Sequence, residues 1–298
     1  MNPWLSGMAT FLDAFDWPMA TAALGFYAFN QSLKTWRFSY YLGGQISVGQ
    51  LMPIVWIHSF WNNILPYRSG ELTYVYLLRQ TRAVSDGQNL MSLLAARSFD
   101  TLALLILIGG VTLLIFPAQS RQLWALQLTG TLSFILATIA ALLLLVLFNP
   151  QAVALCHNLQ TRLPARGQPV MSKLAEAVAA LQRLRNPVAL GSFTVLSLIV
   201  WFTDILYVWC VFQAARLPLT PFQALFICAF PVLAALLPIQ TPAGLGIFEG
   251  TVTGGLLLLG LPRGAALQGS VLLHAHILFS SSALFALAWL WRRWQRRL

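Results

Sequence analysis

Long uninterrupted apolar runs are the feature that most restricts what this chain can fold into. Four of them reach about 20 residues or more, the length that an α-helix needs to cross the hydrocarbon core of a bilayer. They cover residues 97–116, 123–148, 188–212 and 265–291. Only 9% of the residues are charged, whereas soluble domains carry about 25%. A water-soluble globule is therefore excluded, and backbone in lipid must fold as helices.

A fifth apolar run, residues 17–34, is shorter and contains Asn30 and Gln31, and we expect it to span as well. The predicted fold class is all-α, a polytopic integral membrane protein with about five full spans. We expect residues 1–298 to form a single transmembrane domain.

The stretch 151–187 is predicted to be a cytoplasmic amphipathic loop. In it, the spacing of Leu174, Val178 and Leu181 beside basic residues is typical of a helix on a membrane surface. The loop would join two candidate half-repeats, residues 17–150 and 188–291.

Basic residues indicate the orientation, because cytoplasmic loops carry an excess of Lys and Arg. Most of the 18 Lys and Arg residues lie in clusters beside apolar runs, namely Lys34 and Arg37, Arg79 and Arg82, residues 162–185, and residues 292–297. We therefore expect a multi-pass protein of the bacterial inner membrane with a cytoplasmic C-terminus. The net charge of +10 would suggest nucleic acid for a soluble protein, but its position beside spans indicates anionic lipid instead.

Two stretches join half-length apolar segments through a polar or Gly/Pro-rich break. The first break is 66–71, between 46–65 and 72–82, and the second is 238–246, between 221–237 and 247–261. The later arms are short for a hydrocarbon core of about 30 Å. Each stretch is therefore predicted to be a broken pair of helices or a re-entrant hairpin, and the two alternatives stay open. Entry from opposite faces would make an inverted repeat of the kind found in transporters.

The first break carries the densest polar cluster at membrane depth, with Asn63, Arg68 and Glu71. Charges inside a membrane are costly and mark functional sites by default. The functional interpretation is that Arg68 binds a phosphate while Glu71 fixes it or receives a cationic headgroup. The alternative is a cytoplasmic turn in which the two side chains form an ordinary ion pair.

Arg97 and Asp100 lie three residues apart on one helix face, so they are placed to pair with each other. Such a pair would neutralise itself at the start of a span, and this is the favoured interpretation. The alternative is that Asp100 is the partner of a basic residue from another helix.

The second break contains Gly244 and Gly246 and is followed by Glu249. Its two prolines and two glycines forbid a continuous helix. A helix that starts near Gly246 would point backbone N–H groups into the membrane, where an anion could dock. Glu249 in its first turn would compete with that anion or pair with its cation. The alternative is an external loop with an ordinary helix-start Glu.

Asp204 lies in the middle of a predicted span. A proton-coupling role and a structural hydrogen bond to a neighbouring helix are both open for it. Sequence signatures of P-loop, serine-hydrolase and zinc-protease sites are absent, and we expect neither a metal nor another cofactor.

Taken together, these motifs resemble the transmembrane-region family of lysylphosphatidylglycerol synthetase/flippase proteins, which includes stand-alone flippase-like members. The matching residues are Asn63, Pro66, Arg68, Gly70 and Glu71, then Arg97 and Asp100, and then Pro238, Gly244, Leu245, Gly246 and Glu249. The chain departs from the family pattern at Ala96, which replaces an acid, and at Ala243, which replaces a glycine.

The resemblance implies a flippase-like protein that translocates or binds a modified lipid, such as an aminoacyl-phospholipid or another amphiphile. It implies a substrate path at Arg68, Glu71, Arg97, Asp100 and Glu249. The polar and glycine residues of the two breaks add Asn63, Gly244 and Gly246 as predicted substrate contacts. It implies no enzyme activity for this chain, since the lysyl-transferase domain is not found in it. The expected partners are membrane lipids, anionic or aminoacylated, and no nucleic acid. A non-transporting accessory protein for a lipid- or polyprenyl-modifying enzyme is the alternative, and homo-oligomers are compatible with both.

Overall fold

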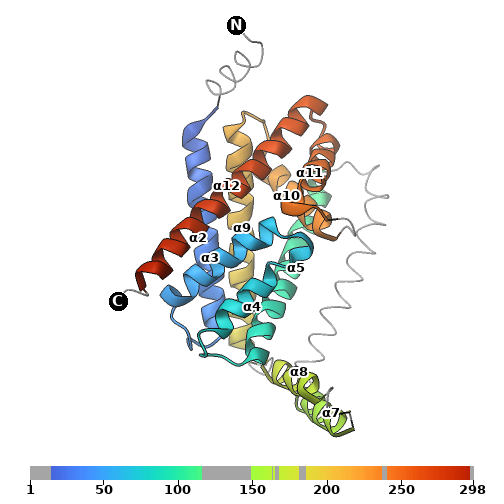
Figure 1. The fold of residues 1–298 in the computed structure, drawn as a ribbon. Helices are drawn as coiled ribbons and strands as arrows, with labels where there is room; N and C mark the ends of the chain where they lie inside the picture. The colour runs from blue at the N-terminus through green and yellow to red at the C-terminus, as the bar shows by residue number, and fades with distance from the viewer. Residues whose placement is uncertain are drawn as a thin grey trace. The chain divides into compact units, whose positions relative to one another are not determined.

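A computed structural model of the protein describes residues 15–115, 149–162, 164, 168–180, 186–236 and 240–295. The elements of this part are all helices, which confirms the all-α prediction for it. They are α2 (Trp17–Tyr41), α3 (Val48–Ile64), η1 (Pro66–Arg68), α4 (Glu71–Arg79), α5 (Asp86–Ile115), α7 (Asn149–Arg162), α8 (Gln168–Ala180), α9 (Pro187–Ala214), α10 (Pro221–Leu236), η3 (Pro242–Gly244), α11 (Ile247–Leu258) and α12 (Arg263–Gln295) (Figure 1). The predicted span 123–148 lies outside the described residues.

Two described helices are long and apolar enough to cross a membrane, Val188–Ala214 and Arg263–Trp294. They coincide with the predicted spans 188–212 and 265–291. Helices α2 and α5 have 25 and 30 residues, which is also sufficient length at about 1.5 Å per residue. The total of about five spans stays a prediction.

One order of elements occurs twice along the chain. A long helix is followed by a short helix with an internal proline, a one-turn 3-10 helix that begins with proline, a second short helix and a second long helix. The internal prolines are Pro53 in α3 and Pro231 in α10. In both 3-10 turns the middle residue is left-handed, with φ of 56° at Tyr67 and 54° at Ala243. The two predicted breaks are thus real interruptions of the helices.

The chain forms two compact units, and each draws on both halves of the sequence. Unit 1 comprises Met1–Gln31, Ser59–Gly70 and Phe202–Leu298, and unit 2 comprises Ser32–His58 and Glu71–Trp201.

In unit 1, α11 packs between α10 and α12. Gly255 of α11 faces the ring of Phe230 in α10, and a Cβ at this glycine would lie 2.6 Å from a ring atom. On the side toward α12, the hydroxyls of Thr253 and Ser270 are 2.8 Å apart. The absence of a side chain at Gly255 therefore lets the helices approach closely.

In unit 2, α4 lies antiparallel along the first half of α5. Tyr74 and Ser92 share a hydrogen bond of 3.2 Å between their hydroxyls, and Asn89 donates to the carbonyl of Val75 at 2.8 Å. Helix α5 begins at Asp86, well before the predicted span 97–116. The reason is a capping box, in which Ser85 and Gln88 exchange side-chain and backbone hydrogen bonds of 3.1 and 3.2 Å.

Helices α7 and α8 of unit 2 lie side by side (Figure 1). The predicted amphipathic helix forms as α8, but Val178 is buried against Cys156 of α7 instead of facing a membrane. Leu174 is exposed, as are Leu155 and Leu159 one turn apart on α7. Leu181 lies outside the described residues.

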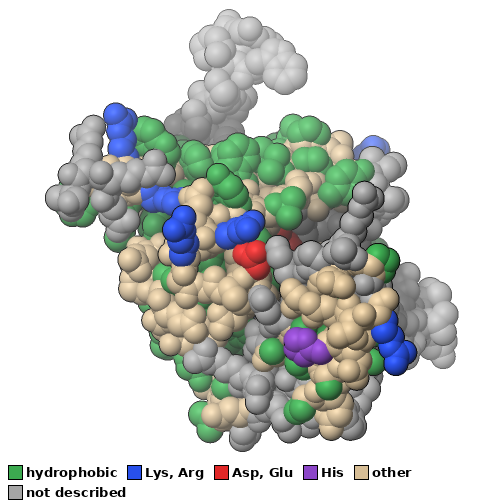
Figure 2. Space-filling model, turned by 60° about the horizontal axis from the view of Figure 1, so that its bottom comes forward, with side chains coloured by type: hydrophobic (Ala, Val, Ile, Leu, Met, Phe, Trp, Pro, Cys, Tyr) green, Lys and Arg blue, Asp and Glu red, His purple; other side chains and the backbone are tan. Residues whose placement is uncertain are grey.

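Large apolar side chains are exposed along α12 of unit 1, and they recur at helical spacing at Leu267, Val271, Phe279, Leu287 and Leu290. Figure 2 shows a face of the molecule on which apolar side chains gather along one edge, and several Lys and Arg side chains lie nearer its centre beside an acidic one. Exposed apolar surface of this extent is unfavourable in water and favourable against lipid.

Candidate functional site

The backbone of the break before α11 adopts left-handed conformations at its two glycines. Gly244 and Gly246 have φ of +70° and +83°, a region that glycine enters without steric cost. Ala243 is left-handed as well. Helix α11 therefore starts afresh at Ile247, with its first turn inside unit 1.

Glu249 caps the helix in which it lies. Its Oε2 accepts a hydrogen bond of 2.7 Å from the N–H of Gly246, and its Oε1 lies 2.7 Å from Nδ1 of His274. The ring of Phe248 stacks on that of His274 with centroids 4.3 Å apart. The helix end that was predicted to receive an anion thus already holds the protein's own carboxylate, and this carboxylate has a basic partner.

A pocket of about 230 Å³ lies beside this pair, in unit 1. Its polar lining consists mainly of uncharged groups, from Asn62, Asn63, Gln240 and Thr241, and His274 forms part of the wall. Gly244 contributes backbone, whereas Glu249 stands behind His274 and Phe248. Of the predicted site residues, the structure thus places Asn63 and Gly244 in the lining of one cavity, and Gly246 and Glu249 follow Gly244 along the chain.

The two breaks meet at this pocket, since η1 and η3 contact each other. Gly70 packs directly on the backbone of α3, and a Cβ there would lie 2.3 Å from the amide nitrogen of Asn62. Asn63 forms a side-chain hydrogen bond with Tyr27 of α2. The turn after α3 therefore holds both asparagines in place beside the second break.

In unit 2, Glu71 pairs with Arg97, and its Oε1 is 2.8 Å from Nε of the arginine. The contact is an ion pair without the alignment of a hydrogen bond, because Arg97 Nε has no hydrogen-bond partner among the described residues. The side chain of Arg68 lies outside the described part, so its proposed phosphate contact stays a prediction.

Asp100 pairs with Arg37 of α2 in unit 2, and not with Arg97 as the favoured interpretation had it. The guanidinium contacts both carboxylate oxygens, with Nη2 3.0 Å from Oδ2, and Nη1 also donates to Ser197 at 2.9 Å. This burial corrects a second prediction, since Arg37 was expected to be a cytoplasmic surface base. The charge of Arg37 is neutralised internally, so α2 continues past Lys34 to Tyr41.

Asp204 is half-buried in unit 1. Its carboxyl group interacts electrostatically with the side chains of Tyr27, Tyr207 and Cys228. Tyr207 in turn shares a hydrogen bond of 3.0 Å with Nδ1 of His276. A proton-coupling role for Asp204 stays a prediction.

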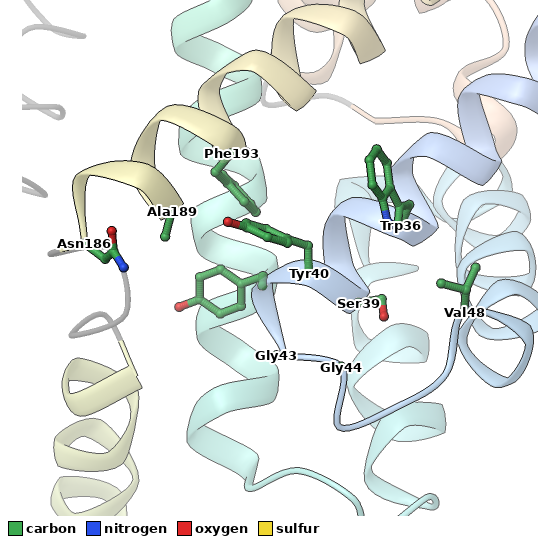
Figure 3. Close-up of a pocket in the computed structure, with 10 residues that line it drawn as sticks. Trp36, Ser39, Tyr40, Gly43, Gly44, Val48, Asn186, Ala189 and Phe193 are labelled. Atoms are coloured by element: carbon green, nitrogen blue, oxygen red, sulfur yellow. The ribbon is translucent and has the colours of Figure 1, made fainter.

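A second pocket, of about 630 Å³, lies in unit 2 between the end of α2 and the start of α9 (Figure 3). Trp36, Tyr40 and Phe193 supply aromatic rings, and the turn at Gly43 and Gly44 supplies backbone. The described residues of its lining carry no charged side chain. Trp36 and Tyr40 are exposed, as expected of interface anchors, whereas Tyr41 is buried against Phe193.

His274, Asn62 and Arg37 were not among the predicted site residues. A signal for His274 exists in the sequence, because it follows Glu249 at nearly the separation at which Arg97 follows Glu71. Both carboxylates lie at the start of a short helix and pair with a base on the next long helix. Asn62 belongs to the polar cluster of the first break, beside Asn63. No local signal identifies Arg37, because its role depends on a contact between distant segments.

These features define an all-helical membrane protein in which two broken-helix turns meet beside a polar pocket. The chain matches the family model described as the lysylphosphatidylglycerol synthase TM region over residues 4–290, so it belongs to this family. Comparison with curated proteins and with solved structures gives no match.

Proposed function

We propose that the protein binds a membrane lipid and moves it between the leaflets, as a flippase-like protein. Family membership supports a role connected with modified lipids. The observation that carries the proposal is the pocket at the contact of η1 and η3, with the Glu249–His274 pair behind it. Polar cavities built from interrupted helices are the usual substrate sites of membrane transporters.

The repeated order of elements supports an inverted repeat, in which the stretches around η1 and η3 enter from opposite faces. The basic clusters support a place in the bacterial inner membrane with the C-terminus in the cytoplasm. We propose a transport or binding role and no group transfer by this chain, with an anionic or aminoacylated phospholipid among its partners.

Reconstitution in liposomes tests the proposal. The wild-type protein should accelerate the exchange of a fluorescent phospholipid between leaflets, measured by bleaching of the outer leaflet with dithionite. Glu249→Gln removes the charge that holds both Gly246 and His274. Since charge-assisted hydrogen bonds contribute about 1.5–3 kcal/mol, we expect exchange to slow by about tenfold or more.

Asp16→Asn is the matched control, because it neutralises a carboxylate of unit 1 outside the pocket. Asp16 pairs with Arg216 at 3.2 Å and accepts from the N–H of Met19 at the start of α2. Asn also caps helices well, so exchange should be unchanged. Equal exchange by the wild type, Glu249→Gln and protein-free liposomes would refute translocation.

A second candidate, the accessory protein, is favoured by one observation. Leu155 and Leu159 of α7 and Leu174 of α8 are exposed together on the α7–α8 pair, a surface that suits a partner protein. Loss of cellular function in Leu155→Ser with Leu159→Ser, together with full function in Glu71→Gln and Glu249→Gln, would support this candidate over the transporter.

A further inference from the structure

His276 of α12 is held inside unit 1 by contacts at both nitrogens of its ring. Nε2 lies 3.2 Å from the carbonyl oxygen of Ala20 in α2. Nδ1 lies 3.0 Å from the hydroxyl of Tyr207 in α9 and 3.2 Å from the hydroxyl of Ser280. Since a carbonyl oxygen only accepts, Nε2 carries a hydrogen, and in the neutral ring Nδ1 is then an acceptor for the Tyr207 hydroxyl.

The same groups also satisfy a protonated ring. A proton added at Nδ1 turns this nitrogen into a donor, and the hydroxyl oxygen of Tyr207 accepts from it. Tyr207 also has a side-chain hydrogen bond with Ser280, whose own hydroxyl donates to the carbonyl of His276 at 2.7 Å. Buried polar groups need hydrogen-bond partners, and here both forms of the ring have them.

A cationic ring inside a membrane span needs a counter-charge. Asp204 lies three residues before Tyr207, one turn away on the same face of α9, and its carboxyl group interacts electrostatically with Tyr207. As a carboxylate, Asp204 supplies the negative charge that a protonated His276 requires. The titratable side chains described around this network are Tyr27 of α2, Asp204 and Tyr207 of α9, Cys228 of α10, Glu249 of α11 and its partner His274 of α12.

A line of contacts joins this network to the unit 1 pocket. The ring centroids of Tyr27 and Tyr207 are 5.4 Å apart, and Tyr27 forms a side-chain hydrogen bond with Asn63. Asn63 lines the pocket, and so does Ile277, the residue after His276. An occupant of the pocket that displaces Asn63 therefore acts on the tyrosine pair beside His276.

We infer that His276 is a proton-binding site, with Asp204 as its counter-charge, and that proton binding there is coupled to lipid binding in the unit 1 pocket. The step adds one proton from the solvent to Nδ1 and turns the neutral ring into a cation. A bound anionic headgroup favours the cation, and by linkage the cation favours the bound anion. The coupling rests on the proposed function and names protons as its energy source, whereas the proton site does not depend on that function.

Nitrogen NMR of the full chain in detergent, with ¹⁵N-labelled histidine, tests the proton site. The chain has 4 histidines, and the signal that is lost in His276→Gln identifies His276. At about pH 8 this ring should be neutral with its hydrogen on Nε2, and at about pH 5 both nitrogens should be protonated. A ring that stays neutral over this range, or that carries its hydrogen on Nδ1 at the higher pH, would overturn the inference.

Titration calorimetry tests the coupling, with dihexanoyl-phosphatidylglycerol as an anionic probe. The difference between the binding heats in phosphate and in Tris buffer gives the number of protons exchanged per lipid. The wild type should take up a fraction of a proton at about pH 7, and His276→Gln should take up none. Gln keeps a donor and an acceptor for Ala20 and Tyr207 but does not titrate.

Two further variants locate the effect. Tyr27→Phe removes the hydroxyl that contacts Asn63, so it should keep the NMR titration of His276 and lose the proton uptake. His157→Gln, which changes an exposed histidine of α7, is the matched control and should behave like the wild type. An absence of uptake in the wild type, or equal uptake by His276→Gln, would overturn the coupling.

The two proposals fail separately. Proton uptake on lipid binding without accelerated leaflet exchange would refute translocation and leave the inference intact. Accelerated exchange that is equal with and without a pH gradient, and equal in His276→Gln, would refute the inference and leave translocation intact.

Discussion

Changing Asp100 to Asn should destabilise the protein by about 3–5 kcal/mol, because it leaves the charge of Arg37 buried without a counter-charge. The side chain of Arg37 is only 2% exposed and that of Asp100 16%. Both terminal nitrogens of the guanidinium reach the carboxylate. Asn keeps one acceptor oxygen but no charge, so the bidentate pair is lost while Arg37 cannot reach water.

The loss of unfolding free energy depends on how deeply the ion pair is buried, and a second, exposed ion pair in unit 2 tests this dependence. Arg79 and Asp86 form an ion pair with 3.4 Å between Nε and Oδ1, but the arginine is 68% exposed. Exposed pairs contribute about 1 kcal/mol or less. Asp86→Asn makes the same chemical change as Asp100→Asn and should cost no more than this.

The assay is equilibrium unfolding of the purified full chain as the mole fraction of SDS is raised in mixed micelles, followed by circular dichroism. A double variant, Arg37→Met with Asp100→Leu, replaces the pair by apolar groups. It should recover most of the lost free energy of unfolding, because no charge then remains buried.

Two results would refute this reasoning. The first is a cost of Asp100→Asn no larger than that of Asp86→Asn. The second is a double variant that is as unstable as Asp100→Asn alone, which would mean that the loss comes from packing and not from an unpaired charge.

Three glycine and alanine positions give further expectations, all measured as changes in the same unfolding free energy. Gly70→Ala should lower the unfolding free energy by about 1–3 kcal/mol, because the added Cβ would clash with backbone at 2.3 Å. The control Gly25→Ala, with no atom within 4 Å of the added Cβ, should stabilise α2 by about 0.5–1 kcal/mol. Equal effects of the two substitutions would contradict the close approach at Gly70. Gly255→Ala should cost about 1–3 kcal/mol, since its Cβ would press on the ring of Phe230 at 2.6 Å, and a neutral effect would show that the ring moves aside. Ala243→Gly should stabilise the second break by up to about 1 kcal/mol, because φ is 54° there, and destabilisation would contradict the left-handed turn.

Much of the secondary structure could be predicted from the sequence because its causes are local. The runs 188–212 and 265–291 became α9 and α12, and the breaks at 66–71 and 238–246 became interruptions around η1 and η3. Helix α5 begins about three helical turns before the predicted span 97–116. The capping box of Ser85 and Gln88 was readable there, but the apolar run begins only later.

The candidate site could be predicted only in part. Asn63 and Gly244 line one pocket, and Glu249 contacts His274 in its wall. The pairing of the charges was wrong, since Arg97 goes to Glu71 and Asp100 to Arg37. Proximity in sequence favoured a pair within one helix, whereas the relative rotation of packed helices selected pairs between helices.

The sequence by itself determined that this chain is a helical membrane protein with two broken helices, because span length and the backbone restrictions of proline and glycine act within a few residues. Only the tertiary structure decided which polar groups are satisfied and which are not. Arg37 meets Asp100 across a separation that no local pattern encodes, and the contact of Glu249 with His274 depends on how α11 and α12 pack.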